Sequence, residues 1–82
     1  MTCDYDKALE FAKEGKWDEA HKLVQPYSDP KSCLIHGYLH RVEGDLSNAG
    51  YWYRRAGKPH CQDSLDTEWA EIARVLLNPA PL

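Results

Sequence analysis

Three side chains that can bind a metal ion recur along one predicted helix. Cys33, His36 and His40 are spaced at i, i+3 and i+7, so on a helix they share one face within about 60° of arc at roughly 100° per residue. Thiolates and imidazoles are ligands that zinc prefers, and His60-Cys61 follow later in the chain. One hypothesis is therefore a small metal-binding protein that uses Cys33, His36, His40 and Cys61.

The same residues also have a structural interpretation, which we favour. Two histidines four residues apart are common on helices, and the spacing of this group matches no closed zinc motif. In this interpretation Cys33 is a small buried side chain, and His36 and His40 pack against the neighbouring pair of helices. No metal or other cofactor is then expected.

The densest aromatic and basic segment is Tyr51-Trp52-Tyr53-Arg54-Arg55. On a helix Tyr53 points to the core, Asn48, Tyr51 and Arg55 point away from it, and Trp52 lies at the border. Exposed Tyr, Trp and Arg are the residue types enriched at protein-binding hot spots. The predicted partner-binding surface consists of Asn48, Tyr51, Trp52 and Arg55, extended by His36 and His40.

Two other interpretations of this segment stay open. The C-terminal helix could cover Trp52 through Trp69 and Ile72, which would leave ordinary surface. Aromatic and arginine side chains also bind nucleic acid, but the net charge of −3 is unlike the basic balance of most nucleic-acid-binding domains. We therefore expect no nucleic-acid partner.

No enzymatic activity is expected from the motifs present. The chain has no phosphate-binding glycine loop, no nucleophile motif and no His-Glu-x-x-His signature. His40, Glu43 and Asp45 could act as an acid and base, but Glu43-Gly44-Asp45 is explained more simply as one helix end followed by the next helix start.

Five amphipathic helices are predicted to position these residues. Apolar side chains recur at helical spacing in five segments, and Gly15 and Gly44 are expected to end helices in a left-handed conformation. Gly50 is expected to permit a close approach between helices. The predicted all-α fold has antiparallel helical hairpins over 5–27 and 30–57 and a C-terminal capping helix over 64–77. The predicted core stripe of the third helix consists of Leu34, Ile35, Tyr38, Leu39 and Val42. That of the fourth helix consists of Leu46, Ala49, Tyr53 and Ala56.

An internal repeat supports two copies of one hairpin. A shift of 29 residues moves Glu14-Gly15, Ala20 and Pro30 onto Glu43-Gly44, Ala49 and Pro59.

The second hairpin resembles a tetratricopeptide repeat, including its Sel-type relatives. Gly37, His40, Gly44, Ala49, Tyr53, Ala56 and Pro59 are similar to that family's small, aromatic, glycine, alanine, aromatic, alanine, proline pattern, with a histidine where an aromatic is typical. The resemblance implies a helical array that works by binding protein. The repeat is shorter than the family's usual length of about 34 residues, and two repeats are fewer than the roughly three that stacking needs. We therefore expect a protein partner or self-association, as in a homodimer.

Length and composition limit the remaining possibilities. The 82 residues allow one hydrophobic core and one domain. Three cysteines are an odd number for a disulfide framework, and the first residues do not resemble a secretory signal, so we expect a cytoplasmic protein. No apolar run approaches the roughly 20 residues of a membrane span, so no membrane association is expected. Residues 31–60 are locally basic, with five Lys/Arg against two Asp/Glu.

Overall fold

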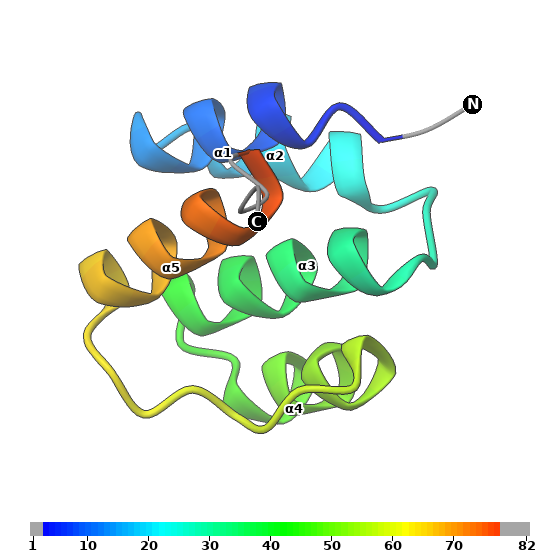
Figure 1. Cartoon of the computed structure of the whole chain (residues 1–82), viewed down its shortest axis with the longest axis vertical. Helices are drawn as coiled ribbons and strands as arrows, with labels where there is room; N and C mark the ends of the chain where they lie inside the picture. The colour runs from blue at the N-terminus through cyan, green and yellow to red at the C-terminus, as the bar shows by residue number, and fades with distance from the viewer. Residues whose placement is uncertain (1–2, 78–82) are drawn as a thin grey trace, which may run out of the picture.

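A computed structural model describes residues 3–77, and every regular element in that range is a helix (Figure 1). This confirms the predicted all-α class. None of the described helices is long and apolar enough to cross a lipid bilayer. The helices are α1 (Tyr5–Lys13), α2 (Trp17–Val24), α3 (Pro30–Val42), α4 (Leu46–Ala56) and α5 (Leu65–Leu77).

Short-range signals in the sequence set most of the helix ends. Asp4, Asp29 and Asp45 each accept a hydrogen bond from the backbone N–H three residues later, and Ser64 does the same ahead of α5. Such bonds satisfy N–H groups that have no partner inside the helix. At the other end, Gly15 and Gly44 have φ angles of 78° and 86°, the left-handed conformation expected for them.

The helices pack in sequential pairs, and α5 then returns to the first helix of each pair. α1 packs on α2, α3 packs on α4, and α5 lies against α1 and α3. Figure 1 shows α4 at one end of the molecule along its longest axis, with α1 and α2 at the other end. Among the described helices, α4 packs its backbone closely on α3 alone, while the Tyr53 side chain of α4 reaches Glu68 of α5 through a hydrogen bond.

The core lies between α1, α2, α3 and α5. Ala20 and Ala49, which the 29-residue shift aligns in the sequence, are both fully buried. The core stripes were wrong at two positions: Leu46 is 57% exposed and Val42 is also exposed. Both flank the turn between α3 and α4, and because only α3 packs on α4, this end of the hairpin extends past the core. The buried apolar side chains include Leu9, Val24, Ile35, Leu39, Ile72 and Leu76.

The close approach between α3 and α4 occurs at Gly37. A Cβ atom there would lie 3.1 Å from the Tyr53 ring and 3.2 Å from the Ala49 carbonyl oxygen, so α4 packs directly on the α3 backbone. The expectation that Gly50 has this role was wrong. A Cβ atom at Gly50 would meet only side-chain atoms, at 3.4 Å or more.

Candidate functional site

The α4 surface, which we define as Asn48, Tyr51, Arg54 and Arg55, faces outward on α4. Tyr51 is 45% exposed. The Arg55 guanidinium donates a hydrogen bond of 3.1 Å to the Tyr51 hydroxyl and lies 5.6 Å from the centre of the Tyr51 ring. The Tyr51 side chain and the Arg55 guanidinium therefore contact each other in the protein alone.

Trp52 links the α4 surface to the interior. Its ring stacks on the imidazole of His36, with 3.8 Å between ring centres and 11° between the planes, and the Arg55 guanidinium lies 5.3 Å from its centre. The alternative in which α5 covers Trp52 was wrong, because α5 packs on α1 and α3. The Trp69 indole N–H instead donates to the Leu9 carbonyl on α1 at 2.9 Å.

His36 and His40 lie inside the molecule, at 3% and 7% exposure, so they do not extend the exposed surface as predicted. The reason is that they project between α2 and α4, where aromatic rings cover them. There they meet His21 of α2, and together these three residues form what we call the histidine cluster. The ring centres are 4.7 Å apart for His21 and His36, 5.4 Å for His21 and His40, and 4.9 Å for His36 and His40.

Stacking and hydrogen bonds fix the rings of the histidine cluster. Trp17 stacks on His21 with 4.7 Å between ring centres, while its indole N–H donates to the Leu39 carbonyl at 2.6 Å. The Nε2 atoms of His21 and His36 are 3.0 Å apart. The Nδ1 atom of His40 lies 2.6 Å from a carboxylate oxygen of Glu43.

Burial keeps two of these imidazoles uncharged near neutral pH. Desolvation, with smaller contributions from the neighbouring His21 and His40, lowers the pKa of His36 to about 4. Desolvation is also the largest cause that lowers the pKa of His21, followed by His40. A neutral imidazole has a free lone pair on one ring nitrogen, and this neutral form is the one that binds metal ions.

The ligand set predicted from sequence does not assemble among the described residues. His36 and His40 come together with His21 instead of with Cys33 and Cys61. Cys33 is fully buried, as the favoured structural interpretation expected, and Cys61 lines a pocket whose lining includes none of the three histidines. Sequence reasoning missed His21 because 15 residues separate it from His36, and only the packing of α2 on α3 joins them.

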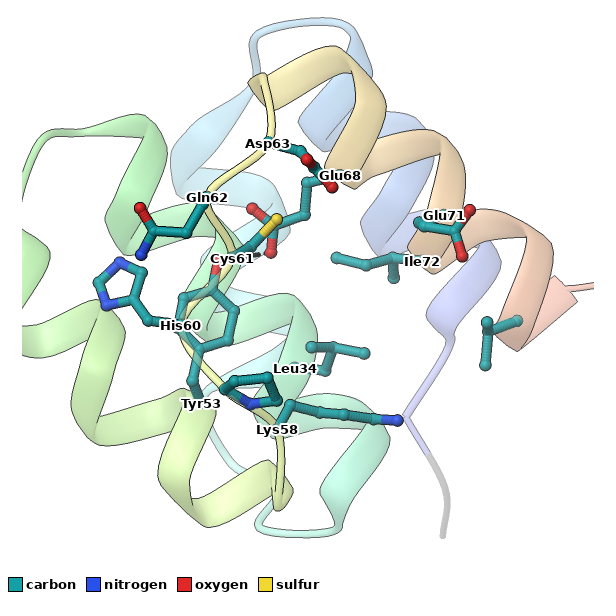
Figure 2. Close-up of a pocket in the computed structure, with 12 residues that line it drawn as sticks. Leu34, Tyr53, Lys58, His60, Cys61, Gln62, Asp63, Glu68, Glu71 and Ile72 are labelled. Carbon is teal, nitrogen blue, oxygen red and sulfur yellow. Dashed lines mark hydrogen bonds between the residues drawn. The ribbon is translucent and has the colours of Figure 1, made fainter.

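That pocket, of about 420 Å³, lies beside the connection between α4 and α5. Figure 2 shows the side chains of Tyr53 and Glu68 pointing toward each other there. The buried Glu68 carboxylate accepts hydrogen bonds from the Tyr53 hydroxyl at 2.5 Å and from the Arg41 guanidinium at 2.8 Å, and Arg41 also donates to the Asp63 carbonyl. These groups satisfy one another, so the network ties the connection to α3 and α4.

No family model, curated protein or solved structure matches this chain. The resemblance to tetratricopeptide repeats therefore stays a prediction.

Proposed function

We propose that this protein is a small helical-repeat module of the tetratricopeptide-like type, and that it binds another protein through the α4 surface. The observation that carries the proposal is the position of α4. It is the outermost helix, with α3 as the only described helix packed closely against its backbone, and its outward side presents the hydrogen-bonded Tyr51 and Arg55 side chains.

The partner that fits this surface best is an amphipathic helix. In helical arrays each hairpin buries its apolar side against the next hairpin, and Tyr51, at 45% exposure, is a large side chain that such a neighbour would cover. Burying a side chain of this size stabilises a complex by about 1.5–3 kcal/mol before the entropic costs of association.

Charge indicates which helix would bind. α4 contains Arg54 and Arg55 in its last turn and no acidic residue, and Lys58 follows the helix. Complementary charge speeds encounter and disfavours wrong partners. The proposed partner is therefore a helix with an apolar stripe and acidic residues beside it.

A second copy of the chain is the competing occupant. Residues 1–30 are acidic, with seven Asp/Glu against four Lys/Arg, so one copy could offer this region to the α4 surface of another. Light scattering over a dilution series separates the two cases, because a dimer would show twice the monomer mass at high concentration.

We also propose a cytoplasmic location. The three cysteines are unpaired, and unpaired thiols are typical of a reducing compartment.

A paired set of variants tests the binding surface. Tyr51→Ala combined with Arg55→Ala should keep the helical circular dichroism and lose capture of the partner from lysate. The matched control is Arg74→Ala combined with Val75→Ala, which removes an exposed arginine and an exposed apolar side chain from α5. The control should capture the partner as the wild type does.

The captured protein is then identified by mass spectrometry, and its acidic helical segment is titrated as a synthetic peptide. Loss of a hot spot worth about 2 kcal/mol weakens binding roughly 30-fold, so the α4 double variant should show at least that loss. Equal peptide affinity for both double variants would contradict the proposal.

A further inference from the structure

The histidine cluster brings three imidazoles from two helices to one point in the interior. We propose that His21, His36 and His40 form a binding site for a divalent transition-metal ion, with zinc as the ion that suits it best. This site lies beneath the α4 surface and does not depend on the proposed partner binding.

The geometry is close to that of a zinc site. Tetrahedral zinc with Zn–N bonds of about 2.0–2.1 Å places its nitrogen ligands about 3.3 Å apart. The Nε2 atoms of His21 and His36 are 3.0 Å apart, and one nitrogen from each of the three rings lies within 4.8 Å of the others.

Glu43 supports His40 in the way that outer residues support metal ligands. Ligating histidines usually donate their second ring N–H to a carboxylate or carbonyl, which fixes the tautomer. In the 2.6 Å contact between His40 Nδ1 and Glu43 the carboxylate is the acceptor, so Nδ1 would be the donor and Nε2 the nitrogen that could bind the ion. That nitrogen is then free for the metal.

His36 has a hydrogen-bonding deficit that the protein does not fill. Its Nδ1 atom is buried and has no hydrogen-bond partner among the described residues, although buried polar atoms are nearly always paired. Its other nitrogen faces only a second imidazole, that of His21. One proton can occupy this contact as an N–H···N hydrogen bond, whereas a metal ion would accept a lone pair from each Nε2 atom and leave the proton of His36 on Nδ1.

Charge near the cluster also suits a cation. Two carboxylates lie close enough to act on His21, those of Glu43 and Asp18. Three protein ligands leave a fourth position for water, as in open zinc sites.

Zinc titration of metal-free protein purified without an affinity tag tests the site. Isothermal calorimetry should show one zinc ion per chain. His21→Gln should abolish binding and leave the fold intact, because His21 is only half-buried on α2. Glu43→Gln should weaken binding about 10–100-fold. His60→Gln, which removes a histidine outside the cluster, should bind zinc as the wild type does.

Cobalt substitution gives a second readout. Co²⁺ in a tetrahedral nitrogen site absorbs visible light, and its spectrum reports ligand type and geometry. The bands should be present in the wild type and in Cys33→Ser and Cys61→Ser, and absent in His21→Gln. Failure of the wild type to take up zinc, retention of binding by His21→Gln, or its loss in Cys61→Ser would each overturn the proposal.

Discussion

Acid should destabilise this protein through His36. In the folded chain burial holds the pKa of His36 at about 4, against 6.5 for an ordinary histidine. Between these values the unfolded chain binds a proton at this position and the folded chain does not. The free energy of unfolding should therefore fall as the pH falls from about 6.5 to about 4, and level off below that for this group.

The size of the effect follows from the pKa difference. One pKa unit corresponds to about 1.4 kcal/mol, so His36 alone should contribute a loss of about 3 kcal/mol across this range. Its side chain is 3% exposed, so solvent provides little screening. A domain of this length has a total stability of roughly 4–12 kcal/mol, which makes this loss a large fraction. His21, whose pKa is also lowered, should add to it.

Urea unfolding followed by circular dichroism measures the effect at pH 7, 6 and 5, with a chelator present so that metal does not contribute. His36→Phe keeps an aromatic ring against Trp52 and removes the titrating group, so its stability should vary less with pH than that of the wild type. His60→Phe serves as the control and should follow the wild type. Equal pH dependence in the wild type and His36→Phe would refute the assignment of a buried, neutral His36.

The remaining predictions concern how α4 is held. Gly37→Ala should lower the free energy of unfolding by about 1–3 kcal/mol, because its Cβ atom would press on Tyr53 and on the Ala49 carbonyl. Gly50→Ala should raise the free energy of unfolding by up to about 1 kcal/mol, because alanine has the higher helix propensity. Equal changes in the free energy of unfolding for the two variants, measured by urea unfolding, would contradict the close packing of α4 at Gly37. Tyr53→Phe should cost about 1–3 kcal/mol, because it leaves a buried carboxylate oxygen of Glu68 without its donor; an unchanged thermal midpoint would contradict this.

The fold was predictable because its signals are local. Apolar side chains at helical spacing, Asp29 ahead of Pro30, and Gly15 and Gly44 after helices each act within a few residues of where they stand. The burial of Ala49 followed from the same periodicity. The exposure of Leu46 did not, because it depends on which helix packs nearby.

The candidate site was predicted only in part, because its residues come together through tertiary packing. The sequence showed that Tyr51 and Arg55 share an outward face. It also placed His36 and His40 on one side of a helix, but the third member of their cluster, His21, lies on a different helix. The path of α5 across α1 and α3, which leaves the outward side of α4 uncovered, is likewise a property of the whole fold, since an apolar stripe does not by itself specify which helix covers it.

Site-specific photo-cross-linking tests the role of the α4 surface most directly. A benzophenone amino acid is placed at Tyr51, or at Val75 on α5 as the control, and the protein is irradiated in cells. We predict that the probe at Tyr51 forms a covalent adduct with one defined protein partner and that the probe at Val75 does not. Two results would contradict the assignment of α4 as the binding surface. In the first, the probe at Val75 forms the adduct and the probe at Tyr51 does not. In the second, neither probe forms an adduct.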